Sequence, residues 1–163
     1  MLGELYTVGA ERPKFIHIHS YIYEKDKFTV GQVVTTKERN RRGTFQSITK
    51  KWREDDFENV RISSFKDLPS RYTCLFLSKN LQNAKYWADK IRSRTGKYQC
   101  VEVELLFGKY VCVDEQIYNI EHFCREDIID EAYSYWSGDE VLDNPIITIL
   151  FEGVFKVCQE IYL

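Results

Sequence analysis

The chain has 163 residues, of which 44% are hydrophobic and 29% charged, a balance typical of one globular domain with a single core. Its formal net charge of −2 indicates neither a nucleic acid nor an anionic membrane as partner. No apolar run reaches the roughly twenty residues of a membrane-spanning helix, and the first residues lack the pattern of a secretory signal. We therefore expect one domain over residues 1–163, in the cytoplasm and with no membrane partner.

The five cysteines are odd in number and widely spaced, and most of them lie in apolar runs typical of strands. This pattern predicts buried free thiols in a reducing compartment rather than disulfides. A metal site needs clustered ligands, and only His122 with Cys124 approaches such a cluster. We therefore expect no bound metal.

The first predicted strand covers residues 15–23, where apolar and aromatic residues occupy both faces of a period-two pattern. A second short strand or an extended connector is expected over residues 28–34, and the basic segment after it is typical of a loop. Apolar residues at positions 57–65 then indicate a short helix before Pro69.

The compact apolar run 74–77 predicts another strand, and a helical repeat of apolar residues over 81–91 follows it directly. Ser78 or Asn80 is placed to cap this helix at its start. Gly96 is placed to end it, because glycine adopts the left-handed backbone conformation after a last helical turn.

Residues 99–105 alternate between apolar and polar side chains, which predicts a half-buried strand. A turn at 107–109 is expected to join it to a further strand at 110–113. Asp114 would then cap a helix that extends to position 132, with its acidic residues on a solvated face.

The chain closes with two expected strands, 146–151 and 154–157, on either side of a turn at Glu152 and Gly153. Strands and helices do not alternate regularly along the chain. An α+β fold with largely antiparallel sheets is therefore favoured over a doubly wound one.

Generic catalytic motifs are absent from the sequence, which has no GxxxxGK[ST], no GxGxxG after a strand, no HExxH, no CxxC and no GxSxG. What stands out is the pair His17 and His19, which are two residues apart on one strand and must point to the same side. Taken alone, such a pair is slightly more often structural than functional.

Three segments, in this order and spacing, resemble the ADP-ribosyltransferase superfamily. The first, His17-Ile18-His19-Ser20, is similar to the strand in which histidine-type members hold the histidine that bonds the NAD ribose. The second runs from residues 75–78 into 83–87, and it is similar to the strand and helix that carry a small polar residue and a tyrosine that grips nicotinamide. The third, residues 149–157, is similar to the closing strands after the catalytic glutamate.

The chain looks most like an uncharacterised bacterial family of unknown function within that superfamily. The resemblance implies an ADP-ribosyltransferase-like α+β fold, with largely antiparallel split sheets and a few flanking helices, and a pocket for NAD as co-substrate or for a related nucleotide. A flat nicotinamide ring needs an aromatic partner and its carboxamide needs hydrogen-bonding groups, which Tyr86 and Asn83 can supply. The residues that match the cofactor-binding motifs are His17, His19, Ser20, Ser78, Asn83 and Tyr86.

The chain departs from the resemblance at the catalytic acid, because Thr148 aligns with the family's glutamate. A threonine cannot supply the negative charge that stabilises an oxocarbenium-like centre as nicotinamide leaves. Transferase activity is therefore expected to be weak or absent, with His19, Tyr86 and Thr148 at the catalytic positions and Glu152 as a substitute acid. The other carboxylates that the sequence offers are Glu102, Glu104 and Glu140.

The segment 37–53 is rich in lysine and arginine and contains Glu38 as its only acid, whereas 114–143 is strongly acidic. Phe45 and Trp52 are interleaved with the basic residues, a composition that suits binding to phosphates and stacking on bases. This segment supports an alternative function, a non-catalytic module that binds a nucleic acid or a protein partner. A solvated loop without a partner is the other interpretation. In the ADP-ribosyltransferase interpretation, the same loop, joined by Arg71, would meet the NAD diphosphate or a substrate.

Overall fold

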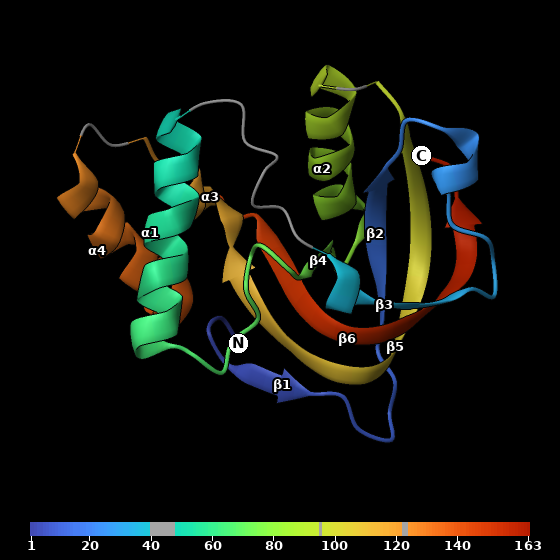
Figure 1. The fold of residues 1–163 in the computed structure, drawn as a ribbon, viewed down its shortest axis with the longest axis horizontal. Helices are drawn as coiled ribbons and strands as arrows, with labels where there is room; N and C mark the ends of the chain where they lie inside the picture. Colours follow the sequence, from blue (N-terminus) through green and yellow to red (C-terminus); the bar gives the residue numbers. More distant parts are fainter. Residues whose placement is uncertain (40–47, 95, 122–123) are drawn as a thin grey trace.

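The computed structural model describes residues 1–39, 48–94, 96–121 and 124–163, and it shows a mixed α/β fold built on a curled antiparallel sheet (Figure 1). The strands are β1 (Leu5–Thr7), β2 (Lys14–Ser20), β3 (Val33–Thr35), β4 (Leu75–Leu77), β5 (Tyr98–Asp114) and β6 (Ile147–Ile161). The helices are α1 (Ile48–Ser64), α2 (Leu81–Arg94), α3 (Glu115–Tyr118) and α4 (Arg125–Ser137), with short 3-10 turns η1 (Glu24–Asp26) and η2 (Thr36–Glu38). An α+β fold with antiparallel pairing is therefore confirmed.

Two long strands, β5 and β6, pair with each other along most of their length, and the shorter strands pair with them. β1 and β2 pair with different parts of β5, and β3 and β4 pair with different parts of β6. β2 and β4 also meet, because the backbone groups of Ile16 and Ser78 exchange two hydrogen bonds of 2.8 and 2.7 Å. The sheet thus curls until β2 and β4 touch, and we call this junction at Ile16 and Ser78 the seam.

The turns expected at 107–109 and at Glu152–Gly153 are wrong, because β5 and β6 each run on through these positions. Gly108 is paired with Gly153 across the two strands, with φ angles of 129° and 154°. A Cβ atom on either glycine would overlap the backbone of the opposite strand. The two glycines therefore allow a close approach of the paired strands, and they do not mark chain reversals.

The helices agree with the sequence in part. α2 is confirmed with its cap, since the Asn80 side chain accepts a hydrogen bond of 2.9 Å from the Asn83 backbone, and Gly96 follows with a φ of 77°. The long helix expected after Asp114 is instead two helices, α3 and α4, although Asp114 does cap α3 through the Gln116 backbone at 3.0 Å. The basic segment 37–53 is not wholly a loop, because α1 begins at Ile48.

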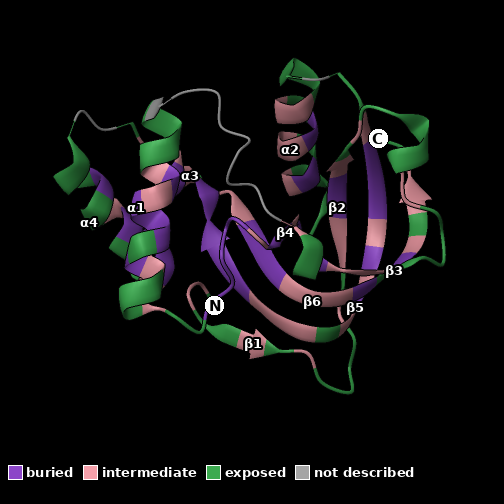
Figure 2. Ribbon diagram, in the orientation of Figure 1, coloured by how far each residue is buried: buried purple, intermediate pink, exposed green. Residues whose placement is uncertain are grey.

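The buried residues form clusters on both faces of the sheet (Figure 2). The inner cluster fills the curl with residues of β4, β5 and β6, among them Leu77, Val101 and Phe155. On the outer face, α1 and α4 cover one part of the sheet, and α2 covers another part at β2 and β5. Among the helices in the described ranges, none has the length and apolar character required to cross a bilayer.

Candidate functional site

His17 and His19 lie on β2 and point to the same side, as their spacing predicts, with ring centroids 5.8 Å apart. His17 is paired with Val101 of the inner cluster, so both histidines face the inside of the curled sheet. His19 stacks on Phe28 at 4.1 Å between ring centroids, and its Nε2 donates to the Asp26 carbonyl at 2.7 Å. Burial is the main cause that lowers the pKa of His19.

His17 is held as one neutral tautomer. Its Nδ1 lies 2.9 Å from the Phe76 carbonyl oxygen, which can only accept, so Nδ1 must carry the proton and Nε2 must be a bare acceptor. That Nε2 is buried and has no hydrogen-bond partner among the described residues. Burial, with the nearby charge of Arg39 as a second cause, lowers the pKa of His17 to about 3. The imidazole is therefore an uncharged acceptor at neutral pH.

The two serines of the expected cofactor site lie at the ends of strands, and only Ser78 lies at the seam. Ser20 is the last residue of β2 and is exposed. Ser78 follows β4, is buried, and forms the seam itself through its backbone bonds to Ile16.

Asn83, Tyr86 and Thr148 are brought together where α2 packs against the start of β6. The Asn83 amide donates to the Ile147 carbonyl at 3.3 Å, and the Trp87 indole donates to the Thr148 hydroxyl at 3.3 Å. Thr148 is fully buried. Asn83, Tyr86 and Thr148 thus lie near one another on the outer face of the sheet.

Within the described ranges, neither His17 nor His19 contacts Tyr86. Ile16 and Ile18 face α2, so the alternation of β2 turns His17 and His19 to the opposite side. A ligand that contacts both groups would have to cross the seam.

Glu152, the expected substitute acid, holds a turn of the chain. Its Oε1 accepts 2.7 Å from the Ser70 backbone and 3.0 Å from the Thr73 hydroxyl, and Lys109 lies 4.0 Å from its other oxygen. Of the alternative carboxylates, Glu102 bonds to Gln159 at 3.3 Å, Glu104 pairs with Arg12 at 3.9 Å, and Glu140 is half-buried after α4.

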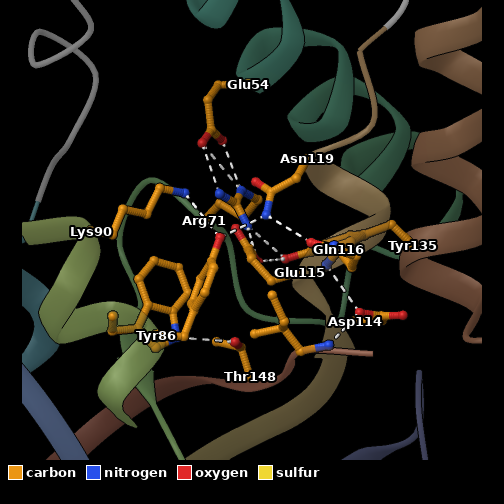
Figure 3. Close-up of polar contacts among 12 residues, drawn as sticks. Glu54, Arg71, Tyr86, Lys90, Asp114, Glu115, Gln116, Asn119, Tyr135 and Thr148 are labelled. Atoms are coloured by element: carbon orange, nitrogen blue, oxygen red, sulfur yellow. Dashed lines mark hydrogen bonds and ion pairs between the residues drawn. The ribbon is translucent and has the colours of Figure 1, made fainter. Parts of the chain in front are cut away.

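The turn held by Glu152 carries Arg71, which is 3% exposed and forms the centre of a buried polar cluster (Figure 3). Its guanidinium makes a two-pronged ion pair with Glu54 of α1, at 2.9 and 3.0 Å. A third nitrogen donates to Glu115 at 2.8 Å and to the Tyr135 hydroxyl at 2.7 Å. Burial lowers the pKa of Arg71, but the Glu115 and Glu54 carboxylates outweigh it and the net shift is upward.

Glu115 is a buried carboxylate that the sequence pattern does not predict. It belongs to the acidic stretch expected on a solvated face, yet it is 0% exposed, because α3 starts at the buried end of β5. One of its oxygens bonds to Arg71 and Tyr135, and the other, Oε1, has no hydrogen-bond partner among the described residues. The burial of Glu115 could have been inferred from its position in the sequence, directly after a buried strand.

Tyr86 connects this cluster to α2. Its hydroxyl accepts from the Asn119 amide at 2.7 Å and lies 3.4 Å from the Lys90 ammonium, as Figure 3 shows. Tyr86, Lys90 and Asn119 are half-buried, whereas Arg71 and Glu115 lie beneath them. We call these residues, together with Glu54 and Tyr135, the polar cluster.

A model of a protein family described as a protein of unknown function, DUF2441, matches residues 6–162. The chain belongs to this family. No curated protein matches the chain.

The basic segment and the weak metal candidate are described only in part. Lys50, Lys51 and Trp52 are exposed at the start of α1, whereas Arg41, Arg42 and Phe45 lie outside the described residues. His122 also lies outside them, and Cys124 donates to Asp127 at 3.0 Å. Within the described ranges, no three histidine, cysteine or acidic residues are grouped as metal ligands.

Proposed function

We propose that this domain binds NAD or a related nucleotide on an ADP-ribosyltransferase-like fold. In this proposal its transferase activity is weak or absent, because Thr148 stands where the resemblance implies a carboxylate. The α+β fold with antiparallel strands supports the proposal in part, because the resemblance implies this class of fold, but it also implies split sheets where the structure has one curled six-stranded sheet.

The observation that carries the proposal is the acceptor on His17. A buried polar atom without a partner is costly, and such atoms in proteins commonly mark a site for water or a ligand. The bare Nε2 of a neutral imidazole suits a hydroxyl donor, such as a ribose hydroxyl. Arg39, whose charge acts on both histidines, supplies positive charge of the kind that binds a diphosphate.

The side chains on α2 support the proposed contact with the nicotinamide ring. Tyr86 and Trp87 present aromatic rings with centroids 5.3 Å apart, and Asn83 adds an amide beside them. In this proposal the ribose contacts His17 and the nicotinamide ring contacts Tyr86, so the nucleotide crosses the seam.

The test is stabilisation of the protein by NAD in a thermal-unfolding titration. Ligand at a hundred times its dissociation constant should add roughly 2.7 kcal/mol to the unfolding free energy. Tyr86→Ala and His17→Ala should remove most of this shift, whereas Tyr162→Ala, at an exposed tyrosine, should keep it. A flat titration of the wild type up to millimolar NAD would contradict the proposal.

A non-catalytic module for a nucleic acid or protein partner is the second candidate function. The observation that favours it is the exposure of Lys50, Lys51 and Trp52 at the start of α1, where Arg125 also lies over the Trp52 ring at 5.9 Å. Exposed cations beside an exposed indole can bind phosphates and stack on a base.

A further inference from the structure

The polar cluster contains a carboxylate oxygen that lacks a donor. Glu115 is fully buried, its Oε2 is engaged by Arg71 and Tyr135, and its Oε1 has no hydrogen-bond partner among the described residues. An ionised carboxylate only accepts hydrogen bonds. The position therefore requires a group that donates.

The surroundings of Glu115 are polar, and two of the neighbouring residues, Tyr86 and Asn119, are partly exposed to solvent. Tyr86 lies close enough for the Glu115 charge to contribute, after burial, to raising the pKa of the Tyr86 hydroxyl. Asn119 lies one turn from Glu115 at the end of the same short helix and bonds to that hydroxyl. Tyr86 and Asn119 are half-buried, so a ligand can enter the polar cluster by displacing their hydrogen bond.

Besides Arg71, the cluster contains the positive charge of Lys90, and Arg53 lies beside it. Lys90 is 3.4 Å from the Tyr86 hydroxyl, and the Arg53 guanidinium lies 5.5 Å from the centre of the Tyr118 ring. These cations limit the net negative charge of the cluster. Selection by Glu115 therefore rests on its bare acceptor atom, at which a hydrogen-bond donor is favoured and a second carboxylate is repelled.

We infer that Glu115 is a specificity-determining residue, which accepts a hydrogen bond from a primary carboxamide on a flat ring and rejects the corresponding carboxylate. This inference rests on the proposed function, and the group in question is the carboxamide of the nicotinamide ring. Tyr86 stacks on the ring while Glu115 receives the amide N–H.

The experiment compares two dinucleotides that differ only at this group, NAD and nicotinic acid adenine dinucleotide, by titration calorimetry on the wild-type protein. NAD is expected to bind about tenfold more tightly or better. In Glu115→Gln the side-chain amide can both donate and accept, so the ratio of the two affinities should fall towards one. Glu126→Gln, at an exposed glutamate of α4, should keep the wild-type ratio.

Glu115→Gln also removes one partner of a buried ion pair, so a variant that keeps the charge is needed. Glu115→Asp retains the carboxylate near Arg71 but withdraws its oxygens by one methylene, and it should weaken NAD binding while the affinity for the acid stays low. Equal binding of the two dinucleotides to the wild type would overturn the inference and leave the nucleotide pocket standing. Binding of neither would overturn the proposed function itself, and the inference with it.

Discussion

His17 shows how the fold sets the chemistry of a single side chain. The sequence places an imidazole on a strand, and the tertiary structure buries it and holds its Nδ1 proton at the Phe76 carbonyl. The cost of burying a charged imidazole is what lowers the pKa of His17 to about 3, and the charge of Arg39 adds to it. Such a group cannot act as an acid near neutral pH, but it can accept a hydrogen bond.

The lowered pKa of His17 predicts how stability depends on pH. The folded-state pKa lies below the ordinary value of 6.5, so below that value the unfolded chain binds a proton that the folded chain does not. The stabilising contribution is therefore complete above about pH 6.5 and declines as the pH falls towards 3. Between pH 7 and pH 5 the decline should be about 2 kcal/mol.

Urea unfolding of the wild type and of His17→Gln at pH 7 and pH 5 measures this dependence. The glutamine side chain can still donate to Phe76 but does not titrate, so the stability of the variant should decline clearly less over the same range. The lowered pKa of His19 acts in the same direction, and His19→Gln gives its share separately. If the wild type and His17→Gln lose the same stability between pH 7 and pH 5, the imidazole of His17 is not held buried in its neutral form.

At the scale of elements, β5 and β6 approach each other closely at a pair of glycines. Gly108 and Gly153 face each other with positive φ angles, and neither site has room for a Cβ atom. Gly153→Ala should therefore cost roughly 3 kcal/mol of unfolding free energy, through backbone strain and overlap with Phe107.

The matched control is Gly9→Ala, since a Cβ atom there meets nothing within 4 Å and the φ angle is not positive. Its effect should stay within about 0.5 kcal/mol. Thermal unfolding of both variants measures the difference. Equal unfolding temperatures for the two alanine variants would show that the close approach of β5 and β6 does not exclude a side chain at position 153.

At the scale of the whole molecule, opposite charges are concentrated in different segments, with a basic stretch at 37–53 and an acidic one at 114–143. Binding of single-stranded DNA through the exposed start of α1 would be tolerant of sequence and sensitive to salt. We expect Lys50→Gln with Lys51→Gln to weaken such binding more than His19→Ala does. Each lysine that neutralises a phosphate should, when replaced, reduce the steepness of the salt dependence by roughly 0.7.

Fluorescence anisotropy with a labelled thymidine oligonucleotide, at several salt concentrations, measures these slopes. His19→Ala is the control, because His19 lies inside the curled sheet and is bonded to Asp26. Absence of binding even at low salt would eliminate the nucleic-acid alternative and leave the nucleotide proposal unaffected.

The sequence by itself determined the local features of this protein. Period-two patterns predicted β2 and the first part of β5, and a helical repeat between Asn80 and Gly96 predicted α2 with its cap. The shared side of His17 and His19 followed in the same way. These features depend on neighbours a few residues apart, so the order of residue types is enough to specify them.

Only the tertiary structure decided which residues meet. Gly108 and Gly153 are residues typical of turns, but their pairing across two strands places them inside continuous strands. Glu115 belongs to an acidic stretch typical of a solvated surface. It is buried because β5 ends next to Arg71, which binds its carboxylate. The seam, which separates His17 from Tyr86, likewise forms between strands that are far apart in the sequence. Burial and long-range pairing depend on how distant segments pack, and a one-dimensional pattern does not contain that information.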